Sequence, residues 1–278
     1  TPVYVYNEKI LRDRMSKVAK VITKYPYTAN YSVKANTNIH ILKLALEEGL
    51  NCDAMSVGEI TLLMKAGFPV ERIFFVPNNV APYELAFALK NGVMTSLDSL
   101  SQLELFGEVC NQMEIAPENR KCAVRINPGV GAGHHEKVVT GGKKTKFGIA
   151  EYSIPQIFEI AEKYQITIAG INQHIGSLFM DPQPYLDAVT NLLRIAHQFK
   201  NLEFIDFGGG YGIPYHKLDD EKDFPMEDFK SRLEPILDEF VASYGKAPLF
   251  KSEPGRFCVA EGSVILGRVH ATKENSGI

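Results

Sequence analysis

The stretch Asn30-Tyr-Ser-Val-Lys-Ala-Asn36 indicates both the fold and the chemistry of this chain. Its alternation of polar and apolar residues is typical of a β-strand whose two faces differ, and it puts Asn30, Ser32 and Lys34 on one face. If helices cover the other face, Lys34 points inward at the carboxyl end of the strand. We expect a lysine in such a partly desolvated pocket to have a lowered pKa and to form a Schiff base. The alternative is a strand-end lysine that extends its ammonium into water.

Short apolar runs alternate with amphipathic helical patterns along nearly the whole chain, which predicts βα units and a parallel sheet. The expected strands are Ala29–Ala35, Asn51–Ser56, Arg72–Pro77, Val93–Leu97, Cys122–Asn127, Ile166–Ile175, Glu203–Phe207 and Pro248–Glu253. The expected helices are Ile39–Glu48, Val57–Ala66, Pro82–Lys90, Leu100–Asn111, Ser153–Tyr164, Tyr185–Phe199 and Glu227–Tyr244. Ser153 and Gln156 have the spacing of a capping box. Eight strands of this kind predict a (β/α)8 TIM barrel over residues 1–260, with a doubly wound open sheet as the alternative.

Both ends of the sequence suggest a piece of a longer protein. The chain begins at Thr1 without a methionine, and the run Ser263–Ala271 alternates like a strand although every barrel position is already filled. We therefore expect residues 261–278 to be the first strand of a truncated C-terminal β domain.

The composition excludes several classes of protein. The 278 residues carry a net charge of −3, with 45% hydrophobic residues, so no basic surface for nucleic acid is expected. No apolar run is long enough to span a membrane, and the first residues do not have the charged-then-apolar pattern expected of a leader. The four cysteines are far apart and form no CxxC pair. The scattered cysteines predict a reduced, cytoplasmic compartment.

Polar residues and glycines follow the expected strands, where a barrel builds its site. The run Gly208–Gly210 comes directly after a strand, and consecutive glycines let backbone N–H groups close around a phosphate. Gly255 and Arg256 follow the last strand and could add another N–H and a cation. A dinucleotide fingerprint is the competing interpretation, but its third glycine is missing. A purely structural glycine turn remains the alternative.

Four further residues require a chemical explanation. Glu253 ends an apolar strand, and a buried carboxylate there needs a partner such as a protonated pyridine nitrogen or an arginine. His174, taken alone, is more often a core histidine than a catalyst. His134 and His135 are adjacent and so poorly placed to bind one ion, and no metal site is expected.

Taken together, these motifs resemble the alanine racemase-fold (fold type III) pyridoxal-phosphate enzymes, and among them the ornithine/diaminopimelate decarboxylase group. The resemblance covers essentially the whole chain, and its motifs fall in the family's order. The stretch from Gly133 to Gly142 is most similar to that of diaminopimelate decarboxylases. The motifs are Ser-Val-Lys34-Ala-Asn, Asp53-Ala-Met-Ser56-Val-Gly-Glu59, Arg125-Ile-Asn-Pro-Gly129, Thr145-Lys-Phe-Gly148, His174-Ile-Gly-Ser177, Gly208-Gly-Gly210 and Glu253-Pro-Gly-Arg256.

The resemblance implies a role for each site residue. Lys34 would carry pyridoxal 5'-phosphate as a Schiff base, and His174 would stack on its ring. Glu253 would pair with the ring nitrogen, and Arg256 would anchor the phosphate or a substrate carboxylate. The catalytic residues would be Lys34, His174 and Glu253. The cofactor would be bound by Lys34, Asp53, Arg125, His174, Ser177, Gly208, Gly209, Gly210, Glu253, Gly255 and Arg256.

The implied reaction is decarboxylation of meso-2,6-diaminopimelate to L-lysine and CO2. A carboxylate at the ring nitrogen keeps the pyridine protonated and able to accept an electron pair, whereas an alanine racemase-like enzyme has an arginine there. Glu253 thus favours decarboxylation over racemisation. Ornithine, arginine or carboxynorspermidine as the substrate, or a non-catalytic pyridoxal-phosphate-binding barrel, are the alternatives.

Family members continue into a β-rich domain that supplies further substrate-binding residues, and a cysteine that reaches the partner subunit's site. The resemblance therefore implies a homodimer for the full-length protein. None of the four cysteines here matches the motif of that cysteine.

Overall fold

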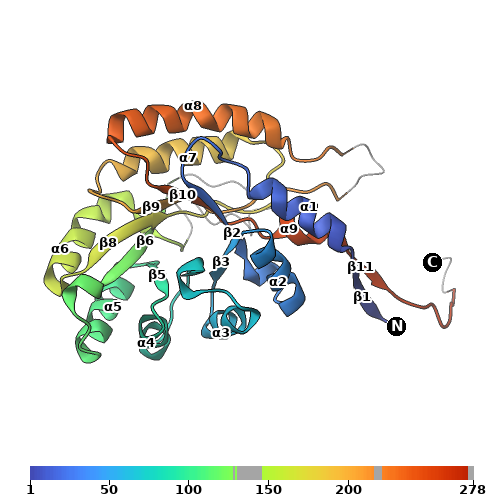
Figure 1. The fold of residues 1–278 in the computed structure, drawn as a ribbon, viewed down its shortest axis with the longest axis horizontal. Coiled ribbons are helices and arrows are strands. Elements are labelled where there is room, and N and C mark those ends of the chain that lie inside the picture. Colours follow the sequence, from blue (N-terminus) through green and yellow to red (C-terminus); the bar gives the residue numbers. More distant parts are fainter. Residues whose placement is uncertain (128, 130–145, 216–220, 275–278) are drawn as a thin grey trace.

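A closed ring of eight parallel strands forms the centre of the structure, a computed structural model that describes residues 1–127, 129, 146–215 and 221–274 (Figure 1). Each strand pairs with the next along the chain, and the last, β10, pairs with the first, β2, with Phe250 opposite Tyr27. The expected barrel is therefore confirmed. Its strands are β2 (Tyr27–Ser32), β3 (Asn51–Ala54), β4 (Ile73–Phe75), β5 (Met94–Leu97), β6 (Lys121–Asn127), β8 (Thr167–Asn172), β9 (Phe204–Asp206) and β10 (Leu249–Ser252).

Helices cover the outside of the ring, and their bounds lie close to those expected. They are α2 (Ile39–Glu47), α3 (Val57–Ala66), α4 (Pro82–Lys90), α5 (Leu100–Gln112), α6 (Ile154–Tyr164), α7 (Gln183–Ala196) and α8 (Met226–Tyr244). A short strand, β7 (Ile149–Ala150), pairs beside β6. The capping box expected at Ser153 is wrong, because Ser153 ends a 3₁₀ turn that runs straight into α6, and its side chain caps nothing. All four cysteines are buried and free.

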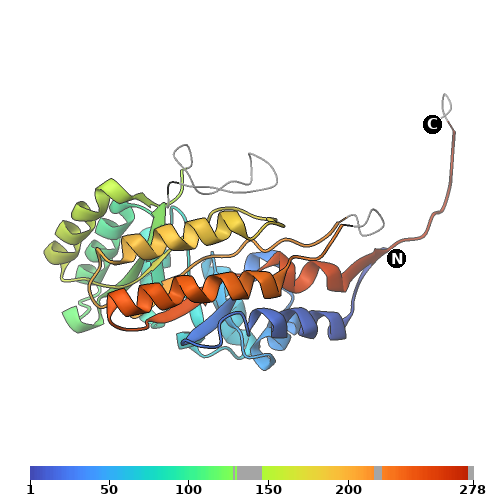
Figure 2. The same ribbon diagram turned by 90° about the horizontal axis from the view of Figure 1, so that it is seen from above.

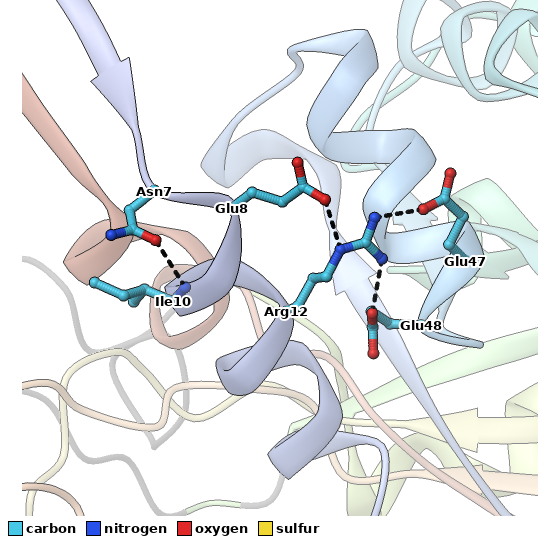
Figure 3. A network of polar contacts seen from close by, with 6 residues as sticks. All are labelled: Asn7, Glu8, Ile10, Arg12, Glu47 and Glu48. Carbon is cyan, nitrogen blue, oxygen red and sulfur yellow. Dashed lines mark hydrogen bonds and ion pairs between the residues drawn. The ribbon is translucent and has the colours of Figure 1, made fainter.

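Two helices outside the repeat were not expected. Helix α1 (Glu8–Val18) begins at Asn7, whose side chain accepts a hydrogen bond from the N–H of Ile10. It contacts α9 (Arg256–Val259), the short helix after β10. Arg12 of α1 also forms ion pairs with Glu47 and Glu48 at the end of α2, at 2.6 and 2.8 Å (Figure 3). These contacts join the start of the chain to both ends of the barrel sequence.

A two-stranded antiparallel ribbon lies beyond α1 and α9, away from the barrel (Figures 1 and 2). Strand β1 (Val3–Tyr6) pairs with β11 (Ser263–Leu266), with Val3 opposite Leu266. The strand expected at Ser263–Ala271 is therefore shorter than predicted. Its residues Val264, Ile265 and Leu266 are exposed. Within the described residues, no helix is both long and apolar enough to cross a membrane.

The interior of the barrel has an apolar end and a polar end. Phe74, Val76, Ala123 and Phe204 pack together inside the ring, with Met94 and Leu249 against them. They close the end where the strands begin. The larger core lies between the strands and the helices. Above these apolar residues, the buried residues that face inward are polar. They lie beneath the carboxyl ends of the strands and are Asn30, Asp53, Ser96, Arg125, Asn172 and Asp206.

Candidate functional site

A cavity of about 560 Å³ opens at the carboxyl ends of the strands. It brings together most of the residues singled out from the sequence, which come from the four loops after β2, β8, β9 and β10. Those that line it are Lys34, His174, Ser177, Gly210, Glu253, Gly255 and Arg256, together with Ser32, Asn36, Tyr211 and Tyr215 among others.

Lys34 reaches this cavity from a 3₁₀ turn and not from a strand. Strand β2 ends at Ser32, and the turn Val33–Ala35 follows, with Asn36 N donating to Val33 O at 3.0 Å. The chain turns because the N–H of Ser32 bonds to Pro254 O, which brings the loop after β10 alongside. Lys34 is exposed as a result. The expected strand through Ala35 and the expected desolvated pocket for Lys34 are both wrong, although the residue does line the site.

Glu253 is the buried acid of the cavity, with only 4% of its surface exposed. Its backbone N–H donates to Gly208 O at 2.9 Å, and no described residue bonds to its Oε1. Burial raises the pKa of Glu253 well above its usual value, and the nearby Asp206 and Asp53 raise it further. Lys34 and Arg125 act on this pKa in the opposite direction. Burial thus disfavours the ionised form of this carboxyl, and a cationic donor in the cavity would favour it.

The glycine run is required by close packing. Gly208 has a φ of +74°, and a Cβ at that residue would lie 2.3 Å from Gln173 O. Gly208 N donates to Asp206 Oδ1 at 2.9 Å, and Gly209 N to Nδ1 of His174 at 3.5 Å. These two N–H groups are therefore used within the protein. Of the three glycines, Gly210 is the one whose atoms line the cavity.

His174 is held at the cavity wall in its neutral form. Burial lowers the pKa of His174 well below its usual value, and the positive charges of Lys34 and Arg125 lower it further. Because the neutral ring presents an uncharged face, it suits stacking better than charge pairing.

Arg256 begins α9 directly after Gly255, at the rim of the cavity. Its Nη1 donates to the hydroxyl of Tyr215 at 3.1 Å, so the guanidinium is held by a second cavity residue. The sequence did not point to Tyr215, since nothing in the run Gly-Ile-Pro-Tyr indicates that its hydroxyl bonds to a charged site residue.

Asp53 and Arg125 lie deeper in the barrel and do not line the cavity. Burial raises the pKa of Asp53 to about 6, against the effect of Lys34. Arg125 forms an ion pair with Asp98 at 3.5 Å, and its guanidinium lies 4.8 Å from the centre of the Phe147 ring. The charges of Asp53 and Arg125 both act on the pKa of Glu253.

Asp206 and Lys251 were also missed. Asp206 could have been found, because it is the last residue of the strand that leads into the glycine run. The stretch Gly133–Gly142, with His134 and His135, lies outside the described residues.

Residues 8–260 match the family described as "Pyridoxal-dependent decarboxylase, pyridoxal binding domain". The chain belongs to this family. A diaminopimelate decarboxylase from Methanothermobacter thermautotrophicus is 39% identical over 99% of the chain. One from Staphylococcus aureus is 32% identical over 99%. The crystal structure of diaminopimelate decarboxylase from Helicobacter pylori complexed with L-lysine superposes with a TM-score of 0.87 at 27% identity, covering 95% of this chain and 66% of that one.

The chain spans 64% and 65% of the lengths of the first two relatives. Its match to the family, in contrast, covers the barrel almost from end to end. The chain therefore covers the part that corresponds to the pyridoxal binding domain of this family.

The groups around the cavity fit the cofactor of this family. A primary amine, a guanidinium and glycine backbone lie around one space, and its volume is in the range of small-molecule sites. The deciding group is the carboxyl of Glu253, because its unpartnered, buried Oε1 suits a protonated ring nitrogen.

Proposed function

We propose that this chain is the barrel of a decarboxylase that uses pyridoxal 5'-phosphate to convert meso-2,6-diaminopimelate to L-lysine and CO2. The buried carboxyl of Glu253, facing the cavity that Lys34 also lines, is the observation that carries the proposal. The names of the relatives support the substrate, as does the L-lysine in the related Helicobacter pylori structure.

Each cavity residue has a distinct task in this proposal. The amine of Lys34 would hold the cofactor covalently, and the neutral ring of His174 would lie against its ring. Arg256, Ser177, Gly210 and Gly255 would bind its phosphate, or Arg256 a carboxylate of the amino acid. Gly208, Gly209, Asp53 and Arg125 would support the site from behind. When bound, pyridoxal phosphate supplies a ring that accepts the electron pair left by departing CO2.

Glu253 would keep the ring nitrogen protonated. When only protein groups face its carboxyl, burial and two neighbouring acids raise its pKa well above the usual value and so favour the protonated form. A cationic ring nitrogen would favour the ionised form, and the proton would then be shared between that nitrogen and Oε1.

We further propose that residues 261–278 begin a second, β-rich domain, and that the complete protein is a cytoplasmic homodimer. The pairing of β11 with β1, away from the barrel strands, supports the domain proposal. The exposed apolar residues Val264, Ile265 and Leu266 support it as well, since such an edge needs a covering strand or layer. Extending the chain past Ile278 to the natural end of the protein should produce the dimer.

Covalent labelling tests the attachment of the cofactor. Borohydride reduction in saturating pyridoxal phosphate, followed by peptide mapping, should place the label on Lys34. The variant Lys34→Ala should take up no label, whereas Lys43→Ala, which changes an exposed lysine on α2, should label normally. A label on another lysine would refute the site.

A substrate panel tests the reaction. The extended protein should release CO2 from meso-2,6-diaminopimelate in preference to ornithine or arginine. Glu253→Gln should lower kcat by about 100-fold or more, as expected for a positioned charged group, while the protein still binds pyridoxal phosphate. A preference for ornithine or arginine would refute the substrate, and cofactor binding without any turnover would favour a non-catalytic barrel.

A further inference from the structure

A second lysine lies inside the barrel, near the end opposite to Lys34. Lys251 is on β10, where Phe250 packs outward against Phe207 and Phe240. Since side chains alternate along a strand, Lys251 and Glu253 both face the interior. The Nζ of Lys251 lies 3.8 Å from the centre of the Phe204 ring and 4.9 Å from that of Phe74.

The ammonium of Lys251 has an unusual set of neighbours. Among the described residues it makes no hydrogen bond and no close ion pair, and it lines a cavity at the end where the strands begin. Two ring faces stabilise a cation, but a largely buried ammonium also requires a counter-charge. An inward-facing lysine beside aromatic rings is therefore explained only if acids lie within electrostatic range.

Asp206 and Glu253 are the acids whose charges act on the pKa of Lys251, although Glu71, Glu114, Glu118 and Glu203 line the same cavity. Asp206 is opposite Lys251 in the register of β9 and β10. Burial lowers the pKa of Lys251, and the charges of Asp206 and then Glu253 raise it. In return, burial raises the pKa of Asp206 to about 7, and Lys251 is among the groups that lower it. The coupling between Lys251 and Asp206 is thus mutual.

Asp206 connects the positive charge of Lys251 to the proposed cofactor site. Its Oδ1 accepts from Gly208 N at 2.9 Å, and its Oδ2 accepts from Nδ2 of Asn30 at 3.3 Å. Asp206 also lies close enough to Glu253 to raise the pKa of that carboxyl, second only to burial. Its charge state therefore reaches both the glycine run and the acid of the cavity.

We propose that Lys251 is a positioning residue for the cofactor site, and that it acts from the far end of the barrel as the counter-charge of Asp206 and Glu253. The role of Glu253 at the cofactor rests on the proposed function, whereas the charge coupling of Lys251 to Asp206 and Glu253 does not. Among the described residues, the other charged or titratable groups near these acids are Asp53 of β3, Arg125 of β6, Lys34 after β2 and, beside Lys34 and Arg125, His174 after β8. The buried tyrosines Tyr27, Tyr185 and Tyr211 also lie within electrostatic range of Asp206.

Carboxyl titration by NMR tests the coupling without any cofactor. In protein labelled at the carboxyl carbons, the resonance lost in Asp206→Asn identifies Asp206, and the one lost in Glu253→Gln identifies Glu253. Lys251→Met keeps the aliphatic packing and removes the charge. It should raise the titration midpoint of Asp206 by about one pH unit, with a smaller rise for Glu253. Lys251→Arg should leave both midpoints unchanged.

Lys121→Met is the matched control. Lys121 lines the same cavity, but it is exposed and paired with Glu203 at 2.7 Å, so its loss should move neither midpoint. A midpoint for Asp206 that is unchanged in folded Lys251→Met would overturn the proposal.

The reciprocal measurement applies even if Lys251→Met fails to fold. In lysine labelled at Cε, the resonance lost in Lys251→Arg identifies Lys251. Asp206→Asn should lower the titration midpoint of Lys251 by about one pH unit. An unchanged Lys251 midpoint in folded Asp206→Asn would equally overturn the proposal. Failure of the borohydride label at Lys34 would instead refute the proposed function and leave these titrations unaffected.

Discussion

The carbonyl oxygen of Glu253 occupies the space that a side chain on Gly209 would need, because a Cβ at residue 209 would lie 1.8 Å from it. The loop after β9 and the loop after β10 are thereby in direct backbone contact. Glu253 N also donates to Gly208 O across the same contact. The buried acid and the glycine run are therefore positioned by one another.

We predict that Gly209→Ala destabilises the protein and displaces Glu253. The overlap involves backbone atoms, which cannot move aside without distorting the ends of both strands. The free energy of unfolding, measured in urea, should fall by about 3 kcal/mol. Gly58→Ala is the control, since a Cβ there has no contact closer than 3.7 Å and the residue lies in α3. That variant should be unchanged or slightly more stable. Equal stability of the two variants would contradict the assigned contact.

The buried acids should make the protein less stable as the pH rises from about 4 to about 7. Burial raises the pKa of Asp206 to about 7 and that of Asp53 to about 6. In this range the folded protein holds protons that the unfolded chain has released, so stability declines with pH, by at most about 1.4 kcal/mol per pH unit for each group. Well below pH 4 both states are protonated at these acids, and their contribution is constant.

Asp206→Asn isolates the contribution of one acid. The amide keeps an oxygen for Gly208 N, and Asn30 can turn so that its otherwise unpartnered Oδ1 accepts from the new amide group. The variant should show a flatter decline between pH 4 and 7 in a series of urea titrations. A slope as steep as that of the wild type would mean that Asp206 ionises normally.

Arg12 is predicted to strengthen the contact between α1 and α2. Its guanidinium pairs with Glu8 on its own helix and with Glu47 and Glu48 on the next, and these acids raise its pKa (Figure 3). Arg12→Met should lower Tm, and the loss should shrink in high salt because the network is exposed. Lys17→Met removes one simple pair, with Asp13, and should have a smaller effect. The same loss at every salt concentration would point to packing instead.

The strands and helices of the barrel were predictable because each βα unit shows the apolar spacing of a strand, then that of a helix, with turn residues between them. The site residues on loops were predictable because the carboxyl ends of parallel strands must meet. What failed depends on contacts between distant segments. Lys34 lies on a turn because Pro254 O bonds to Ser32 N, and α1 is stabilised by partners more than 30 residues away, such as Glu47 and Glu48. No local pattern reports such contacts.

Lys251 shows the same limit within a strand. Its alternation with Phe250 places it inward, but a lysine in an apolar run is usually read as a strand end that reaches water. Only the closed ring brings Phe74, Phe204 and Asp206 around it. Its role could not be predicted before the barrel was known to close.

The contact between Tyr215 and Arg256 leads to the last prediction, which rests on the proposed function. The phenol oxygen accepts from Nη1 of Arg256 at 3.1 Å at the rim of the cavity. Tyr215→Phe removes this bond and leaves the ring in place, so the guanidinium should lose its preferred position. If Arg256 binds the phosphate, the Kd for pyridoxal phosphate, measured by absorbance titration, should rise about three- to tenfold. Tyr83→Phe, on an exposed tyrosine of α4, should leave it unchanged. An unchanged Kd with a raised KM for the amino acid in the extended protein would instead assign Arg256 to the substrate carboxylate, and no change in either quantity would show that Tyr215 does not position Arg256.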